Sequence, residues 1–329
     1  MRAVVCVGSG DESVLRLQQC ASPLCGPEEV LIETTATSVN RADLLQRQGY
    51  YPPPEGASEI LGLEASGVII ETGERVQQYQ VGDEVMALLA GGGYGEQVVA
   101  SEGHVLRIPG PISRVEAGAV PEVFITAFLN LVVLGQLQPG ERVLIHGGSG
   151  GVGTAAIQLA KALGAEVWTT CGSDERADKC RALGAHRAFN YRQTGRDGDI
   201  PLFAEAVQRE GGADLILDVV GAKYLDINVG ALARGGRLVV IGLLGGVKGT
   251  LNLGRLLTIR GSVLGSTLRS QSVSQKRGLI DRFKEEVWPL LDNGKIAPII
   301  DRCLPVESVA EAHGIMARGE QFGKLVLTF

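Results

Sequence analysis

The sequence has no excess of positive charge, since 31 Lys and Arg stand against 37 Asp and Glu and give a net charge of −6 at pH 7. Proteins that bind nucleic acid or anionic membrane surfaces use clustered positive charge, so this balance argues against both kinds of partner. Long apolar runs are missing too. The most apolar segment, residues 123–134, is interrupted by Thr126 and Asn130 and is too short to cross a bilayer. We therefore expect no nucleic-acid partner and no membrane span.

Cysteine and histidine are both scarce and scattered. The six cysteines show neither CxxC spacing nor regular pairing, which is typical of reduced thiols in a cytoplasmic protein. The N-terminus lacks the long apolar stretch and the small-residue cleavage site of a signal peptide. None of the four histidines stands at metal-ligand spacing, and His146, at the end of a predicted strand, is expected to be a hydrogen-bonded core residue. We predict a soluble, cytoplasmic protein.

Glycine, in contrast, is abundant: the chain has 46 among 329 residues, about twice the usual share of roughly 7%. The local patterns of strand-like and helical segments divide the chain into three stretches. Residues 1–118 are short strand-like runs between turns and predict a compact, mostly antiparallel β domain. From 119 to 262, strand candidates alternate with helical patterns, which predicts an α/β domain with a parallel sheet and right-handed crossovers.

Several elements are expected at defined positions. In the first stretch the strand candidates include 30–32, 66–70 and 84–88. After residue 263 the sequence predicts a helix over 276–291 and a closing strand over 324–329. The strands expected in the middle stretch are 142–146, 166–171, 214–219 and 237–242.

A glycine-rich loop carries the sharpest local signal. The pattern GxGxxG, formed by Gly148, Gly150 and Gly153, directly follows the predicted strand 142–146 and directly precedes a helical pattern. In that setting one glycine makes the turn, one lets the backbone approach a pyrophosphate, and one lets helix and strand pack closely. The helix N-terminus then offers N–H groups and a partial positive charge to the phosphates. We predict dinucleotide binding, because a purely structural turn would not need three glycines at this spacing.

The end of the second predicted strand indicates which dinucleotide binds. NAD sites usually place an acidic residue there, about 20 residues past the glycines, on the ribose 2′-hydroxyl. Here that position is near Gly172, which offers no carboxylate to repel a 2′-phosphate, while Ser173 and Arg176 can donate hydrogen bonds to it. Asp174 and Glu175 complicate this interpretation, since a shift of two residues would reverse it. The prediction is NADPH rather than NADH.

Beyond these patterns, the chain resembles a known family over nearly its whole length. The motifs concerned are 40–43 (NRAD), 49–54 (GYYPPP), 61–67 (LGLEASG), the glycine loop and 322–326 (FGKLV). They are similar to those of the zinc-free, zeta-crystallin-like quinone oxidoreductases of the medium-chain dehydrogenase/reductase superfamily. The stretch from Asn40 through the proline triplet most resembles the branch of tumour-suppressor-induced quinone oxidoreductases.

The resemblance implies a fold and a division of the chain. It implies a GroES-like, β-rich catalytic domain formed by residues 1–118 with 263–329. A Rossmann domain with a doubly wound parallel sheet, residues 119–262, would bind the cofactor, and the active cleft would lie between the two domains.

The same resemblance bears on zinc. Zinc alcohol dehydrogenases of this superfamily have a catalytic Cys where this chain has Asn40, and a His where it has Leu63. They also insert a lobe with four Cys, and residues 93–109 contain nothing of that kind. A catalytic zinc needs three protein ligands, and Asn and Leu cannot replace thiolate and imidazole. We expect no metal.

The resemblance also implies catalytic residues. Without zinc, the protein must hold the acceptor against the nicotinamide and help charge build up on an oxygen. Asn40 and Tyr51 are assigned as hydrogen-bond donors on the oxygen side, with Tyr50 as the neighbouring alternative to Tyr51. The neighbouring charged residues are given structural roles: Glu64 orients its neighbours, while Asp43 and Arg47 form an ion pair rather than transferring protons.

The cofactor contacts implied by the glycine loop and by the resemblance form one set. Tyr191 is expected over or beside the adenosine 2′-phosphate, and Thr126 near the nicotinamide, just before an apolar helix. The complete set is Thr126, Gly148, Gly150, Gly151, Val152, Gly153, Gly172, Ser173, Arg176, Tyr191, Gly242, Leu243, Ser266, Thr267 and Leu268.

Three functions remain open from the sequence. The leading hypothesis is an NADPH-dependent quinone reductase that acts on a small-molecule quinone. A reductase of α,β-unsaturated carbonyls would use the same hydride geometry with a differently shaped pocket. A nucleotide-binding scaffold with little turnover is the third. The resemblance further implies a homodimer joined through the edges of its Rossmann sheets, to which the apolar segments 238–244 and 260–264 are suited.

Overall fold

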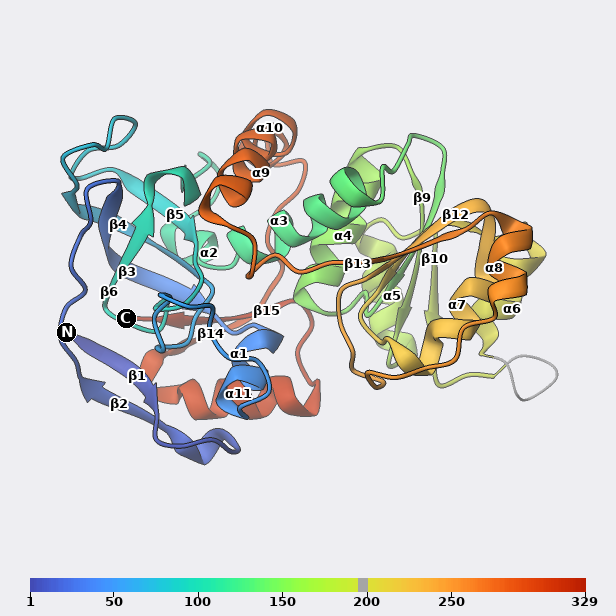
Figure 1. Cartoon of the computed structure of the whole chain (residues 1–329), viewed down its shortest axis with the longest axis horizontal. Coiled ribbons are helices and arrows are strands. Elements are labelled where there is room, and N and C mark those ends of the chain that lie inside the picture. Colours follow the sequence, from blue (N-terminus) through green and yellow to red (C-terminus); the bar gives the residue numbers. More distant parts are fainter. Residues whose placement is uncertain (195–200) are drawn as a thin grey trace. The chain divides into compact units, whose positions relative to one another are not determined.

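A computed structural model describes residues 1–194 and 201–329 (Figure 1). The chain forms two compact units, the first comprising Met1–Ile125 and Leu268–Phe329 and the second Thr126–Thr267. The predicted boundaries at 118 and 262 come a few residues earlier. The second of them falls inside strand β13 (Ser262–Gly265), which belongs to the sheet of the second unit.

Unit one is built on β-sheets, as the short strand-like runs predict. Its main sheet has seven strands in the order β14-β15-β3-β4-β5-β7, with β6 also paired to β3, and every pairing except β14 with β15 is antiparallel. A separate antiparallel pair joins β1 and β2. The strands are β1 (Arg2–Cys6), β2 (Leu15–Gln19), β3 (Glu29–Ser38), β4 (Glu64–Thr72), β5 (Glu84–Leu88), β6 (Gln97–Ser101), β7 (Val105–Arg107), β14 (Ile300–Pro305) and β15 (Lys324–Thr328).

Helices and single helical turns connect the strands of this unit. The predicted helix over 276–291 is in fact two helices, because Pro289 fits only the first turn of a new helix, so the chain breaks near Val287. The helices and turns are η1 (Glu12–Val14), α1 (Arg41–Arg47), η2 (Glu102–His104), α2 (Arg114–Ala117), α9 (Val273–Glu286), α10 (Trp288–Asp292), η5 (Val306–Ser308) and α11 (Val309–Arg318). Helix α3 (Pro121–Phe128) contains the division between the units.

Unit two contains one parallel sheet of six strands in the order β10-β9-β8-β11-β12-β13. In Figure 1, α4 and α5 lie on one side of these strands and α6, α7 and α8 on the other. The strands are β8 (Arg142–His146), β9 (Glu166–Cys171), β10 (Arg187–Asn190), β11 (Ala213–Asp218), β12 (Leu232–Val240) and β13 (Ser262–Gly265). The helices are the π-helical η3 (Leu129–Leu134), α4 (Gly151–Ala162), α5 (Asp174–Leu183), α6 (Leu202–Arg209), η4 (Ala222–Tyr224), α7 (Leu225–Ala231) and α8 (Leu253–Ile259).

This strand order is that of a doubly wound dinucleotide-binding sheet. The strand order reverses between β8 and β11, the first strands of the two halves. The predicted α/β class and doubly wound sheet are confirmed. Ligands of such sheets bind at the carboxyl ends of the strands, and the glycine loop lies there because it directly follows β8.

Candidate functional site

The glycine loop between β8 and α4 has the geometry of a phosphate cradle. Gly147 turns the chain with φ +72°, a backbone conformation that favours glycine. Gly150 is the N-cap of α4 and lies on an open side, since a Cβ atom there would meet nothing nearer than the Gly147 oxygen at 3.4 Å. The N–H groups of the first turn of α4 have no partner within the helix and can receive an anion.

The other two glycines of the pattern are required for packing. A Cβ atom on Gly148 would lie 2.0 Å from Thr169 Oγ1, and one on Gly153 would lie 2.2 Å from the Gly147 oxygen. The close packing expected of the glycines is therefore present, while the approach to a pyrophosphate stays a prediction. The turn itself is made by Gly147, outside the GxGxxG pattern. Its position directly after a strand was the signal for this role.

The end of β9 carries no carboxylate over its glycine. The space above Gly172 is taken by Tyr191, whose hydroxyl would lie 3.1 Å from a Cβ atom added there. Ser173 caps α5 by accepting the Arg176 N–H at 3.3 Å, so Arg176 lies in the first turn of the helix. Three groups thus lie close together at the end of β9: the Ser173 hydroxyl, the N-terminus of α5 and Tyr191.

The two acidic residues that complicate the cofactor assignment have partners of their own. Asp174 accepts hydrogen bonds from the side-chain amides of Asn190 and Gln193, each at 3.1 Å. Glu175 forms an ion pair with Lys179 one turn along α5, at 2.7 Å. Neither carboxylate occupies the position of Gly172 at the end of the strand.

The remaining predicted cofactor contacts are distributed over both units. Gly242 and Leu243 follow β12, and Ser266 and Thr267 follow β13, so parallel strand direction brings them to the same edge as the glycine loop. Thr126 was expected to precede the apolar helix, but it lies inside α3 and is buried. Leu268 is the first residue of the second segment of unit one.

Asp218, at the end of β11, is a residue of this edge that the sequence reasoning missed. It is completely buried and accepts the N–H groups of Val220 and Gly221 at 2.7 and 3.1 Å. Burial raises the pKa of its carboxyl to about 6, although these hydrogen bonds lower it. Its position directly after an apolar strand run was the available signal.

His146 is a core residue, as predicted. It is 1% exposed, and its ring nitrogens lie 3.0 Å from Thr170 Oγ1 and 2.8 Å from Asn228 Oδ1. Because Asn228 Oδ1 can only accept, Nε2 of His146 carries the proton and Nδ1 accepts from Thr170. Burial lowers the pKa of this imidazole to about 4.

In unit one, a buried polar cluster surrounds Asn40 and Glu64. Oε1 of Glu64 accepts hydrogen bonds from Ser38, from Asn40 Nδ2 at 2.9 Å and from Lys324 Nζ at 2.9 Å, while Oε2 accepts the Glu122 N–H at 2.9 Å. Lys324 also donates to Asn40 Oδ1. The side chains of Glu64 and Lys324 are 0% and 3% exposed. Glu64 therefore orients Asn40, the role expected of it, but Lys324 was not singled out from the sequence.

A second buried chain starts at Asp43, which caps α1 by accepting the Asn40 N–H at 2.8 Å. Tyr94 donates to Asp43 at 3.2 Å and lies 3.0 Å from His313 Nε2, and Arg47 Nη1 donates to His313 Nδ1 at 3.2 Å. The expected direct ion pair between Asp43 and Arg47 is wrong. Tyr94 and His313 connect the two residues instead, and the ion pair that Arg47 makes is with Glu12, at 3.8 Å.

Tyr51 lies against a cation. The guanidinium carbon of Arg269 is 5.4 Å from the centre of the Tyr51 ring, within the range of a cation–π interaction. Tyr50, the alternative to Tyr51, is 78% exposed. Burial raises the pKa of the Tyr51 phenol, with Arg269 lowering and Glu122 raising it further.

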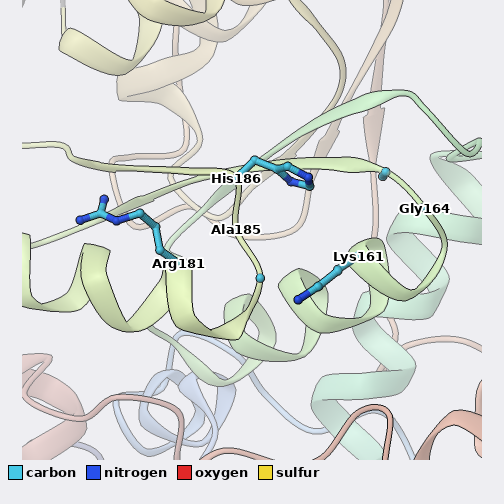
Figure 2. A pocket seen from close by; sticks show the side chains of 7 residues that line it. Lys161, Gly164, Arg181, Ala185 and His186 are labelled. Carbon is cyan, nitrogen blue, oxygen red and sulfur yellow. The ribbon is translucent and has the colours of Figure 1, made fainter.

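A shallow hollow of about 430 Å³ lies at the opposite edge of the parallel sheet, where α4 and α5 end (Figure 2). Lys161, Arg181 and His186 line it, and in Figure 2 their side chains point in different directions. The carbonyl ends of two helices face this hollow and favour cations over anions. Lys161 and Arg181 therefore complement the helix dipoles, and we assign no ligand to this hollow.

The buried histidines make a prediction about acid stability. Burial lowers the pKa of His313 to about 3, whereas an unfolded histidine titrates near 6.5, so the unfolded chain binds more protons between these values. Stability from His313 is fully present above pH 6.5 and is lost as the pH falls, by about 2 kcal/mol at pH 5. The H313Q variant retains an acceptor for Arg47 and a donor for Tyr94 but cannot be protonated. Its loss of unfolding free energy between pH 7 and pH 5 should therefore be about 2 kcal/mol smaller than that of the wild type.

Urea unfolding at pH 7, 6 and 5 measures this difference. Protonation of Asp43, whose pKa burial raises to about 6, opposes the histidine effect in both proteins equally and so cancels in the comparison. An identical pH dependence in H313Q and wild type would contradict the prediction.

Comparisons with known proteins agree with this architecture. Residues 26–110 match the alcohol dehydrogenase GroES-like domain, and residues 151–285 match the family described as zinc-binding dehydrogenase. With a GroES-like unit and a Rossmann sheet, the protein is a medium-chain dehydrogenase/reductase, an oxidoreductase class that binds a nicotinamide nucleotide. It is 32% identical to the quinone oxidoreductase of Lama guanicoe over 99% of its own length and 97% of that protein. The chain belongs to the quinone oxidoreductase family.

Solved structures of two other kinds are also similar. An NAD-dependent alcohol dehydrogenase shares 32% identity with a TM-score of 0.86 and covers all of both chains. The CurK enoyl reductase shares 29% identity with a TM-score of 0.86 over 99% of this chain and 98% of that one. The fold and family are therefore defined, while these two neighbours are named for different reactions.

Among the described residues, no group of three or more His, Cys, Asp or Glu is arranged to hold a metal ion. No helix of the described part is long and apolar enough to span a bilayer. The six cysteines all lie in that part, as free thiols.

Proposed function

We propose that this protein reduces quinones with NADPH, by hydride transfer that does not use zinc, and that it acts in the cytoplasm. The family name of its relatives supports the substrate class, because the matched quinone oxidoreductase is aligned over almost its whole length. The observation that carries the cofactor assignment is the glycine at the end of β9. The carboxylates that follow it already have partners, Asp174 with Asn190 and Gln193 and Glu175 with Lys179.

The residues at the carboxyl edge of the parallel sheet fit a phosphorylated dinucleotide. The open side of Gly150 and the first turn of α4, including Gly151 and Val152, would hold the pyrophosphate. Ser173 and Arg176 would donate to the 2′-phosphate beside the Tyr191 ring. The dinucleotide supplies the hydride when it is bound.

Residues of unit one would act on the acceptor oxygen. Tyr51 donates a proton or a hydrogen bond to the oxygen on which charge develops. Asn40 uses one amide N–H on Glu64, and its other contact, to the Ser38 carbonyl, is long at 3.4 Å. Exchanging that weak contact for the acceptor oxygen would let Asn40 serve as the second donor.

The zinc-independent part of the proposal rests on the donor set. Asn40 and Leu63 stand where zinc alcohol dehydrogenases have Cys and His, and neither supplies a metal ligand of the required kind. The Lys324 ammonium also lies against Asn40 and Glu64, so the protein itself supplies a positive charge at this place. Metal analysis of the purified enzyme, followed by assay after chelation, tests this part: stoichiometric zinc with loss of activity would refute it.

A steady-state assay tests the function itself. NADPH oxidation is measured with 1,4-benzoquinone, an ortho-quinone and an enone as acceptors, and the proposal requires the quinones to be preferred. Preference for the enone would support the second candidate, an enone or enoyl reductase, which the likeness to the CurK enoyl reductase favours. Tight NADPH binding without oxidation by any acceptor would instead indicate a low-turnover nucleotide-binding scaffold.

Removal of the Tyr51 hydroxyl should slow the reaction. The Y51F variant keeps the ring against Arg269 but loses the donor, so we expect kcat/KM for the quinone to fall about five- to tenfold. Y50F, which changes the exposed neighbouring tyrosine, is the matched control and should keep the wild-type value. An unchanged kcat/KM in Y51F would reduce Tyr51 to a packing role.

We also propose a homodimer that pairs two copies of β13. This strand is the edge of the parallel sheet, where unpaired backbone groups can join another strand. Val263 on β13 is 36% exposed, and a charge there would disfavour pairing. Analytical ultracentrifugation should therefore find a dimer for the wild type and a monomer for V263D, whereas L24D, at a 92% exposed site of unit one, should remain dimeric.

A further inference from the structure

Arg269 is a buried cation whose charge has no obvious structural use. It is 6% exposed, and among the described residues no carboxylate forms an ion pair with it. Its Nη1 atom is buried and has no hydrogen-bond partner in the described part of the chain. Burying an uncompensated charge is unfavourable, so a guanidinium kept in this state calls for an explanation beyond packing.

Three hydrogen bonds fix the orientation of this guanidinium. Nε and Nη2 donate to the Ala90 carbonyl at 2.9 and 2.7 Å, and Nη2 also donates to Gln46 Oε1 at 2.7 Å. Gln46 is held in turn, because its amide nitrogen donates to the Glu59 carbonyl at 3.0 Å. The plane of the cation is therefore set by α1 and by the end of β5, independently of Tyr51.

The charged face that this arrangement presents lies against the Tyr51 ring, at 5.4 Å from the ring centre. Resting on the function proposed above, we propose that Arg269 is a positioning residue for Tyr51. It holds the phenol ring in place, and it stabilises the phenolate that remains when Tyr51 gives its proton to the reduced acceptor.

The proton and electron balance of this step is simple. The acceptor receives a hydride from the reduced nicotinamide, which is thereby oxidised, and an electron pair moves onto the acceptor oxygen. The O–H bond of Tyr51 breaks, a new O–H bond forms on the acceptor, and solvent later returns a proton to the phenolate. A nearby fixed positive charge favours the phenolate over the phenol, so it makes Tyr51 a better acid.

The other charged groups around this pair are few. Glu122 acts on Tyr51 and raises the pKa of its phenol, opposite to Arg269. Asp43 and Lys276 act on Arg269 itself, and the Lys276 ammonium donates to the Arg269 carbonyl at 2.8 Å. Arg269 is therefore the group facing Tyr51 whose removal makes the phenol harder to ionise.

The two acceptor classes should depend on Arg269 to different extents. Hydride addition to a quinone leaves an aromatic hydroquinone anion, which is stable without immediate protonation. Addition to an enone leaves an enolate, a stronger base that needs a proton donor. We expect R269M to lower kcat about three- to fivefold with an enone and less than twofold with a quinone, while KM changes little.

The ionisation of Tyr51 itself gives a readout that does not depend on turnover. Ultraviolet difference titration of wild type against Y51F isolates the Tyr51 phenol, and its midpoint should lie at higher pH in R269M than in an Arg269 protein. R269K keeps the charge and should remain near the wild type. R269Q is neutral but can still donate to Ala90, and it should follow R269M, which keeps the test valid if R269M does not fold.

A matched control and a double variant complete the experiment. Arg107 stacks on Tyr79 at 5.5 Å in the same unit, so R107M removes a similar contact and should leave kcat and the Tyr51 midpoint unchanged. In a Y51F background R269M should cause no further loss of kcat with the enone. The proposal would be overturned if R269M lowered kcat with the enone as much in the Y51F background as in the wild type. It would also be overturned if the Tyr51 midpoint did not shift in either R269M or R269Q. If the wild type oxidised NADPH with no acceptor but the midpoint still shifted, only the catalytic proposals would fail, and the Arg269–Tyr51 contact would stand.

Discussion

Replacing Arg176 with alanine is expected to raise the KM for NADPH about 10- to 100-fold while the KM for NADH stays within twofold. A hydrogen bond to a charged partner contributes about 1.5–3 kcal/mol, and each 1.4 kcal/mol corresponds to about a factor of ten. Arg176 lies in the first turn of α5, near Ser173 and Gly172, where a 2′-phosphate would be bound. NADH lacks that phosphate and therefore serves as an internal control.

The same helix offers a control substitution. Arg181 lies in the last turn of α5 and forms an ion pair with Asp178. R181A removes a cation at the C-terminal end of α5, away from the proposed 2′-phosphate site, so neither KM should change. If R176A raised both KM values equally, or if the wild type preferred NADH, the assignment of NADPH would be wrong and an NAD site would replace it.

Loss of the Lys324 ammonium should destabilise the protein by about 3–5 kcal/mol, the usual effect of removing one partner from a buried ion pair. In K324M, Glu64 keeps the hydrogen bonds of Asn40 and the Glu122 N–H, but its charge has no cation. The double variant K324M/E64Q removes both charges and should recover part of the lost stability. Urea unfolding of the four proteins of this cycle, which includes E64Q, measures the coupling between the two residues.

An exposed ion pair gives the comparison. Arg302 pairs with Asp301 at 2.7 Å, but its side chain is 46% exposed, so R302M should change stability by less than about 1 kcal/mol. A similarly small effect of K324M would contradict the prediction.

Elements with a strong local pattern could be predicted residue by residue. The strands 84–88, 142–146 and 166–171 match β5, β8 and β9, because short runs of Val, Ile and Leu between turn residues admit few alternatives. The glycine loop was predictable for the same reason, since the strand, turn and helix that define it are adjacent in the sequence. Strand β12 begins earlier than the predicted 237, at Leu232, because its first residues are paired by the fold rather than marked by an apolar run.

The candidate catalytic residues were only partly predictable. Asn40 and Tyr51 were inferred from family motifs. Both lie in unit one, and their catalytic role stays a proposal. The partners that hold them were not inferred. Lys324 is 284 residues from Asn40, and Arg269, which lies against Tyr51, is 223 residues from its own partner Gln46. No local pattern indicates that such distant side chains meet, and the predicted pair of Asp43 and Arg47 was wrong because neighbours on a helix were assumed to choose each other.

The sequence by itself determined the class of cofactor, the alternation of strands and helices in the second unit, and the family, since these depend on spacing over a few tens of residues. The tertiary structure alone decided which charges are paired. Lys324 reaches Glu64, and His313 reaches Arg47, only after β15 and α11 have packed in unit one. Burial then makes these contacts strong, because a charge removed from water must find its partner within the protein.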